Sequence, residues 1–245
     1  MTPMATAWRR SHQPWPSSTS FTKYISPTSV VDVGCGTGVF LQEFQNRGVV
    51  SILGLDGPRT RTVFDADKSN FFAVDLTKSL ELDQVFDLAH CLEVADHLPE
   101  ISASLLVKTL TDLAPFVLFS AAHPGQGGHG HINERWPAYW QRRFSQHRFV
   151  ALEILRGPLS GHPRVLDCCR WNLVLYAESS HCTSILKRAK SLGVADTFIL
   201  IHEAGVTTEL EHQPWRILIQ TLKLMLKFGR RTRRALRRWV PATNP

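Results

Sequence analysis

The stretch Val30-Val31-Asp32-Val33-Gly34-Cys35-Gly36-Thr37-Gly38 decides the fold of this chain of 245 residues. It reads as a strand that runs through a glycine-rich turn into a helix. Glycines in such a turn permit backbone angles that side chains forbid, and they let a ligand approach the backbone closely. The N-terminus of the helix then offers free N–H groups to an anionic group such as a phosphate or a carboxylate.

Around this stretch, short β-branched runs alternate with helical patterns, which is typical of βαβ units and a parallel sheet. Strands are predicted over residues 29–33, 51–56, 71–74, 86–91 and 116–120, and a helix over 102–113. Two more strands, 149–155 and 172–176, have no long helix between them and are expected to form an antiparallel pair. We therefore predict an α/β fold with a Rossmann-like, doubly wound, mostly parallel sheet of about seven strands and helices on both faces.

The composition is that of an ordinary globular protein, with 43% hydrophobic and 20% charged residues. No uninterrupted apolar run approaches the ~18 residues of a membrane-spanning helix. The five cysteines are odd in number and include no CxxC pair, which favours reduced thiols over a disulfide framework. We therefore expect a cytoplasmic location, with a membrane surface or an organelle as alternatives suggested by the two ends of the chain.

The net charge of +7 is a property of the C-terminal part. Residues 213–245 hold nine Lys or Arg and no Asp or Glu, whereas the first 212 residues hold 19 basic and 21 acidic residues. An apolar helix with one polar stripe is predicted over 214–228, before an arginine-rich end. We expect a flexible leader over 1–26, a domain over 27–205, and a basic amphipathic C-terminal helix or tail over 206–245.

Residues 214–239 suit a helix that lies on an anionic membrane surface, and they suit equally well a helix that packs on the domain with a solvated basic end. Binding to nucleic acid is not favoured, because few aromatic residues stand among the arginines and the body of the chain is slightly acidic. The leader has the bias of a transit peptide, while its prolines favour a plain disordered leader. The sequence implies no particular oligomeric state.

The spacing of the glycines distinguishes a dinucleotide site from another kind of cofactor site. A dinucleotide site would place the third glycine of GxGxxG at position 39, but this chain has Val39 there and its glycine at Gly38. The resulting Asp-x-Gly-x-Gly-x-Gly pattern resembles motif I of the class I S-adenosylmethionine-dependent methyltransferases. The resemblance implies that the chain is a methyltransferase and that its cofactor is S-adenosylmethionine.

Acidic residues follow the next two strands in order. Asp56 ends the second strand, where one carboxylate supplies the two acceptor oxygens that a ribose diol needs. The resemblance implies that Asp75 and Leu76 border the adenine, and that residues 86–98 (FDLAHCLEVADHL) correspond to the fourth-strand motif of the family. The predicted cofactor-binding residues are Asp32, Gly34, Cys35, Gly36, Gly38, Asp56, Gly57, Asp75, Leu76, Cys91 and Leu92.

The segment FVLFSAAHPGQGGHGHINERWPAYW, residues 116–140, narrows the resemblance. It is similar to a subgroup of methyltransferase type 11/12-like proteins from bacteria, phages and some algae, which carries a GQGGxGHxNEQxPxYW signature. The similarity covers about residues 27–176. Where the subgroup has an aromatic VxWWYxQN strand, residues 165–172 read VLDCCRWN, which implies a different substrate or a loss of activity.

Candidate catalytic residues follow the fifth strand, at the edge where α/β sheets bind ligands. They are His129, His131 and Glu134, with His131 preferred as a general base because an imidazole titrates near neutrality. The alternative is that His131, Asn133 and Glu134 bond to the loop backbone and hold its shape. No metal is predicted, because a glycine-rich loop without Cys or carboxylate at ligand spacing makes a poor zinc site.

Glu93 and His97 resemble residues that line the cleft in quinone-type methyltransferases, although a helix-start acid with a capping role also explains Glu93. The expected reaction is in-line transfer of a methyl group to a small-molecule or glycan-linked acceptor. The alternative is a non-catalytic S-adenosylmethionine-binding module that the basic tail recruits to membranes or nucleic acid. Methylation of RNA is a third hypothesis.

Overall fold

The computed structural model describes residues 22–152, 154–155, 172–193 and 201–202. The chain divides into two units, Met1–Ala204 and Gly205–Pro245, and every described residue belongs to the first. The predictions for most of the leader, for the altered segment 165–171 and for the tail therefore lie outside the described residues. Within the described part, no helix combines the length and the apolar character needed to cross a membrane.

One sheet of eight strands organises the fold, in the order β3-β2-β1-β4-β5-β7-β6-β8. Three of the seven predicted strands have the predicted bounds, and the other four differ by a few residues. The strands are β1 (Ser29–Val33), β2 (Ser51–Asp56), β3 (Phe71–Ala73), β4 (Leu88–Leu92), β5 (Phe116–Ser120), β6 (Phe149–Leu152), β7 (Val174–Glu178) and β8 (Ile201–His202).

The sheet is parallel from β3 to β5 and antiparallel beyond it. β6 and β7 pair antiparallel, as predicted, and the two-residue strand β8 adds to the outer side of β6. The predicted fold class is confirmed, with one short strand more than the sequence indicated. The chain passes from β1 outward to β3 and then returns to place β4 on the other side of β1, which makes a switch point at the carboxyl ends of β1 and β4.

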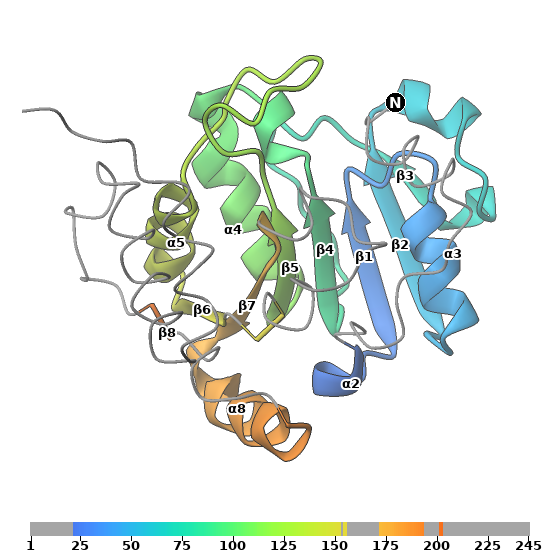
Figure 1. Cartoon of the computed structure of the whole chain (residues 1–245). Helices are drawn as coiled ribbons and strands as arrows, with labels where there is room; N and C mark the ends of the chain where they lie inside the picture. Colours follow the sequence, from blue (N-terminus) through green and yellow to red (C-terminus); the bar gives the residue numbers. More distant parts are fainter. Residues whose placement is uncertain (1–21, 153, 156–171, 194–200, 203–245) are drawn as a thin grey trace, which may run out of the picture. The chain divides into compact units, whose positions relative to one another are not determined.

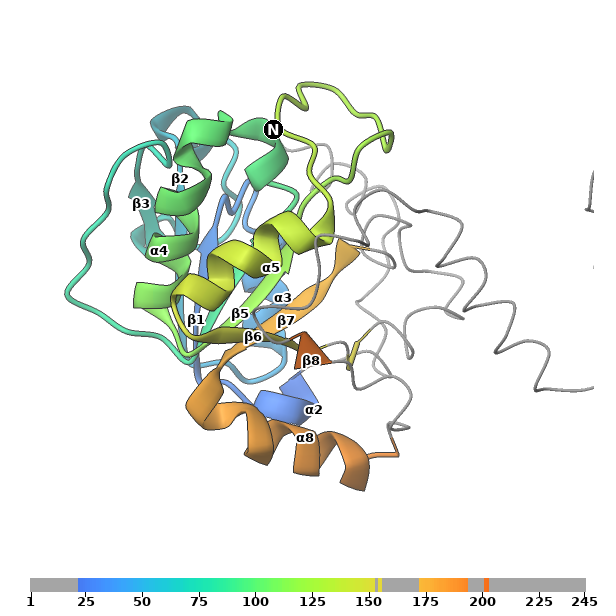
Figure 2. The same ribbon diagram turned by 90° about the vertical axis from the view of Figure 1, so that its left-hand side faces the viewer.

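Helices cover both faces of the sheet, as Figures 1 and 2 show from two directions. One face is covered by α3 (Val39–Asn46), together with α2 (Thr22–Ile25) and α8 (Cys182–Ser191). The other is covered by α4 (Ala103–Leu113) and α5 (Pro137–Gln146). Short 3-10 turns, η2 (Pro58–Thr62), η3 (Lys68–Asn70), η4 (Ala95–His97), η5 (Glu100–Ser102) and η6 (Ser179–His181), connect these elements.

The helix bounds follow from local sequence. Helix α3 buries the apolar positions Phe40, Leu41 and Phe44 against the sheet, and Gly48 with φ 90° follows its end. Pro137 begins α5, where its missing N–H costs nothing. The segment predicted as a leader includes α2 (Thr22–Ile25). Tyr24 of this helix is buried in the same core as the apolar residues of α3.

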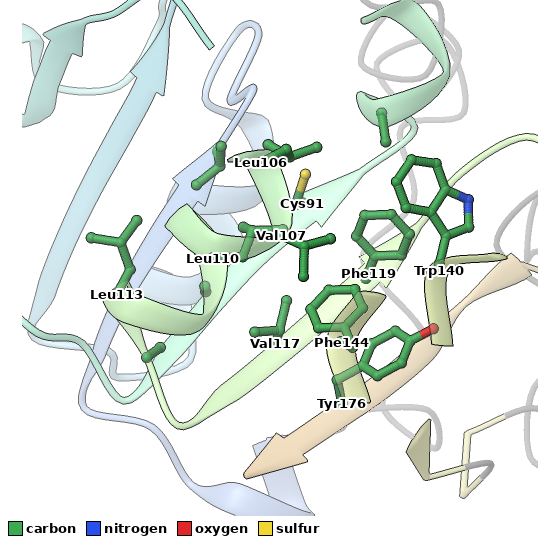
Figure 3. Close-up of a cluster of buried hydrophobic side chains, with 14 of the residues drawn as sticks. Cys91, Leu106, Val107, Leu110, Leu113, Val117, Phe119, Trp140, Phe144 and Tyr176 are labelled. Carbon is green, nitrogen blue, oxygen red and sulfur yellow. The ribbon is translucent and has the colours of Figure 1, made fainter. Parts of the chain in front are cut away.

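An aromatic cluster holds α5 on the sheet (Figure 3). The Phe144 ring stacks on Tyr176 of β7 with centroids 3.8 Å apart, and it meets Phe119 of β5 edge-on at 5.4 Å. Trp140 packs against Phe119 from the same helix face. Trp140 and Phe144 are therefore core residues of α5, while Trp136, just before the helix, is 46% exposed.

We expect Phe144→Ala to lower the free energy of unfolding by about 3–5 kcal/mol, because Phe144 is fully buried and the neighbouring rings cannot close the cavity. Urea denaturation followed by circular dichroism measures this change. Ile101→Ala is the matched control, since Ile101 is 91% exposed and its truncation removes almost no packing. Equal stability of the Phe144 variant and the native chain would contradict this account of the core.

Candidate functional site

The glycine turn, residues 34–38, lies at the carboxyl end of β1 and has the backbone that the sequence predicted. Gly34, Gly36 and Gly38 all have positive φ, at 80°, 52° and 77°. The N–H of Gly34 donates to the carbonyl of Leu55 at 2.7 Å, which ties the turn to β2. A Cβ on Gly34 would come within 2.3 Å of Val94, so glycine is required where the turn packs on the segment after β4.

Asp56 ends β2 beside this turn, and its carboxylate is already organised. It accepts hydrogen bonds from the N–H of Gly36 at 2.9 Å, from the N–H of Gly57 at 2.6 Å and from the hydroxyl of Thr60 at 3.0 Å. A Cβ on Gly57 would meet nothing within 4 Å, so there is open space beside the carboxylate. The structure thus brings together Gly36, Asp56 and Gly57, three of the predicted cofactor residues.

Asp75 follows β3, next to the end of β2, because the N–H of Val74 donates to the carbonyl of Asp56 at 2.8 Å. Its side chain is exposed and accepts from the hydroxyl and N–H of Thr77, with Lys78 3.3 Å away. The hydrogen bonds from Thr77 lower the pKa of Asp75, so the group is ionised at neutral pH. Leu76 is half-buried and packs on the core of the α4 face.

Asp32 is the residue before the last of β1, just before the turn, and its side chain is buried beneath α3. One oxygen is 2.7 Å from Nδ1 of His90, which stands beside it on β4. The rings of Phe40 and Phe44 pack on His90 with centroids 4.8 and 5.6 Å away. Asp32 is therefore placed to join β1 and β4 through a buried Asp–His pair, which nothing in the sequence pattern indicated.

Two predicted cofactor residues with thiol side chains are buried. Burial raises the pKa of the Cys35 and Cys91 thiols well above the usual range, with the charge of Asp32 acting in the same direction. Cys91 faces the α4 core, and Leu92 faces the α3 core. Only the backbone of these positions is therefore available at the edge of the sheet.

The Glu93 cluster, formed by Glu93, Ser120, Gln126 and Asn172, lies just past the ends of β4 and β5. Glu93 has φ 53°, a left-handed backbone that is uncommon for a residue with a side chain. Its carboxylate accepts from Nε2 of Gln126 at 3.0 Å and from Nδ2 of Asn172 at 3.4 Å, while Asn172 also donates to Gln126 at 2.7 Å. The N–H of Glu93 donates to the hydroxyl oxygen of Ser120 at 3.1 Å.

Burial is the largest influence on Glu93 and raises the pKa of its carboxyl group, partly opposed by a hydrogen bond to Ser120. The capping role considered for Glu93 is not what the structure shows, because its carboxylate binds side chains rather than helix N–H groups. The sequence left Gln126 and Asn172 unassigned because the partners of their side chains lie 33 to 79 residues away along the chain.

The glycine loop, residues 121–136, rises above the carboxyl ends of the strands in Figure 1. Glu134 organises it by accepting from the N–H of Gly125 at 3.0 Å and of Gly127 at 3.1 Å. These bonds and the one from His131 lower the pKa of Glu134. His129 is exposed.

The loop is fastened to the segment after β4 through Asp96. The carbonyl of Asp96 accepts from the N–H of Ile132 at 2.8 Å and of Asn133 at 3.1 Å. His131 lies between two carboxylates, with Nδ1 3.2 Å from Glu134 and Nε2 3.0 Å from Asp96. The contacts of Asn133 and Glu134 match the alternative in which these residues hold the shape of the loop.

The glycine turn, the two acids and the polar groups beyond β4 all meet at one edge of the sheet. Residues 9–152 match the family described as "Methyltransferase domain". The chain belongs to this methyltransferase family. This match confirms that the chain carries the predicted methyltransferase domain. The methyltransferase matches none of the curated proteins.

Solved structures share the fold at low sequence identity. An O-methyltransferase family protein from Burkholderia thailandensis has 12% identity and a TM-score of 0.50, and the match covers 66% of the methyltransferase and 54% of that chain. S-adenosylmethionine-bound CalS10, an amino pentose methyltransferase from Micromonospora echinaspora, has 13% identity, a TM-score of 0.53, and coverage of 73% and 97%. A TehB-like methyltransferase from Corynebacterium glutamicum has 15% identity, a TM-score of 0.51, and coverage of 71% and 96%. The match thus spans about half of the first protein and nearly all of the other two.

We expect His90→Leu to lower the free energy of unfolding of the methyltransferase by about 3–5 kcal/mol, because it leaves the buried Asp32 carboxylate without its partner. Chemical denaturation at neutral pH measures the loss. The double variant Asp32→Val/His90→Leu serves as the control and should recover most of the stability, since replacing both partners removes the uncompensated charge. A single variant as stable as the native chain would show that the pair contributes nothing.

Proposed function

We propose that this methyltransferase acts on a small-molecule or glycan-linked acceptor held at the carboxyl edge of the sheet, between the glycine turn and the glycine loop. The observation that supports this proposal is the Glu93 cluster, which joins a buried carboxylate of raised pKa to the loop at the switch point. Open α/β sheets bind their ligands at such a point. The close approach of Gly34 to Val94 brings the glycine turn next to Glu93.

The residues of the glycine turn and of the next two strands fit S-adenosylmethionine. Asp56 Oδ2 accepts one bond, from Gly36, and keeps a lone pair for a ribose hydroxyl in the open space beside Gly57. Asp75 stands at the end of the neighbouring strand and is assigned to the adenine amino group. Asp32 is assigned a positioning role, because its buried side chain joins the strand before the turn to β4.

S-adenosylmethionine supplies a methyl group on a positively charged sulfur, which is already activated for transfer. The protein therefore needs chiefly to align the acceptor and to exclude water. For a hydroxyl acceptor a base is required, and we assign this role to Glu93, because burial raises its pKa towards neutrality. His131, the base expected from the sequence, has both ring nitrogens facing carboxylates, which favours a structural role.

We also propose that the chain belongs to the methyltransferase subgroup with the GQGGxGHxNE loop. Its support is that Gln126, His131, Asn133 and Glu134 of this motif all make specific contacts that hold the loop or join it to the Glu93 cluster. A cytoplasmic location, and contact of residues 214–239 with an anionic membrane, are proposed on charge and composition alone.

We expect Asp56→Asn to weaken the binding of S-adenosylhomocysteine by about 10- to 100-fold, because a charged acceptor is replaced by a neutral amide at the ribose. Isothermal titration calorimetry on the folded full chain measures the affinity. Asp112→Asn is the control, since this acid is exposed on α4 and pairs with Lys108. Unchanged affinity in the Asp56 variant would overturn the assignment of the ribose site.

We expect Glu93→Gln to slow methyl transfer to a hydroxyl acceptor by about 10²- to 10⁴-fold, because the general base is lost. The base acts when ionised, so the native rate should rise with pH through a pKa above the ~4.3 of an ordinary glutamate, and the variant should lack this rise. Release of S-adenosylhomocysteine across a panel of phenols, sugars and carboxylic acids measures the rate.

Glu178→Gln, at the opposite edge of the sheet, is the control for this substitution. If the native chain binds S-adenosylhomocysteine and yet forms none from S-adenosylmethionine above background with any acceptor, that result would favour the non-catalytic binding module. A Glu93 variant with native rates would remove Glu93 from the mechanism while leaving the cofactor site in place.

A further inference from the structure

A second group of polar side chains lies beside the Glu93 cluster and takes no part in the methyl transfer proposed above. The Asp96 cluster consists of Asp96 and His97 from η4 and His131 from the glycine loop. One ligand atom from each residue lies within 4.8 Å of the other two. The carboxylate of Asp96 is 3.0 Å from Nε2 of His131 and 3.5 Å from Nε2 of His97.

The outer nitrogen of each imidazole is already committed as a donor. Nδ1 of His97 lies 3.1 Å from the carbonyl oxygen of Gly130, which can only accept a hydrogen bond. Nδ1 of His131 lies 3.2 Å from the carboxylate of Glu134, which is an acceptor as well. In the neutral ring the proton is therefore on Nδ1, and Nε2 of both histidines presents a lone pair towards Asp96.

Asp96 is a buried carboxylate that needs a cation or a hydrogen-bond donor, and the described residues donate no hydrogen bond to it. Its side chain is 0% exposed, and among the described residues neither carboxylate oxygen has a hydrogen-bond partner. The 3.0 Å contact with His131 does not have the alignment of a hydrogen bond, and Nε2 of His97 has no hydrogen-bond partner within the described ranges either. Three electron-rich atoms in a buried space repel one another unless a cation lies between them.

We propose that Asp96, His97 and His131 bind a divalent transition-metal ion. Two imidazole nitrogens and one carboxylate suit Zn²⁺, Co²⁺, Ni²⁺ or Fe²⁺ better than Mg²⁺ or Ca²⁺, which prefer oxygen ligands. The hydrogen bonds from Nδ1 to Gly130 and Glu134 are the outer contacts that orient metal-binding histidines in proteins. The ion fastens the glycine loop to the segment after β4, and its remaining coordination positions are open to water or to a ligand.

The sequence predicted no metal because the glycine-rich loop has no Cys or carboxylate at ligand spacing. The histidines of that loop do not come together in the structure. His129 is exposed, and His123 bonds to the carbonyl of Pro124 and stacks on Trp136. Of these three histidines, only His131 turns inward, towards Asp96 and His97, which lie more than 30 residues earlier in the chain.

The test compares Zn²⁺ binding by the full-length chain and by His97→Gln and His131→Gln, after removal of metal with a chelator. We expect each variant to bind one equivalent of Zn²⁺ less than the native chain by calorimetry. With Co²⁺ as the probe, the visible absorption of the native complex should be lost in both variants. Because His97 keeps 23% of its side chain exposed, its variant should fold, and circular dichroism checks this.

His181→Gln is the matched control, since His181 follows β7 at the opposite edge of the sheet and packs on Phe116. It should bind as much Zn²⁺ as the native chain. Equal Zn²⁺ uptake by the native chain and a folded His97→Gln variant would overturn the proposal. Nuclear magnetic resonance evidence that both imidazoles stay protonated in the presence of excess Zn²⁺ would also overturn it, because protons would then neutralise Asp96. Binding of S-adenosylhomocysteine, measured separately, distinguishes this failure from a failure of the cofactor site.

Discussion

The contact between Gly34 and Val94 is the constraint on which the arrangement of the site depends. With no Cβ at position 34, the turn after β1 can pack directly on the segment that follows β4. The positive φ of Gly34 allows the turn to reach the carbonyl of Leu55 at the same time. Three strand ends are thereby held together, and any larger residue at position 34 would push the β1 turn away from Glu93.

The second constraint is the way in which the glycine loop is held over this edge. A loop with four glycines has little preference for one conformation, so its shape must come from its contacts. Glu134 accepts two of its N–H groups, and the Asp96 carbonyl accepts two more. Gln126 then extends from the ordered loop to Glu93, which connects the loop to the proposed acceptor side of the site.

Much of the fold could be predicted because its signals are local. The bounds of β1, β2 and β5 follow from short apolar runs, and α3 follows from apolar residues at helical spacing. The strand β8 was not predicted, since a strand of two residues carries no periodic pattern. The helix Cys182–Ser191 was not predicted either. The order of acids after successive strands predicted Asp56 and Asp75, because parallel strands end at one edge of a sheet.

The sequence by itself predicted the fold class, the methyltransferase family and the sheet edge to which we assign the site, since each depends on spacing within a short stretch. Only the tertiary structure decided that Asp32 pairs with His90, that Glu93 meets Gln126 and Asn172, and that His131 faces Asp96. These contacts join residues from separate strands and loops. No periodic pattern records such pairs, because which side chains meet is set by strand order and by the path of the loop in three dimensions.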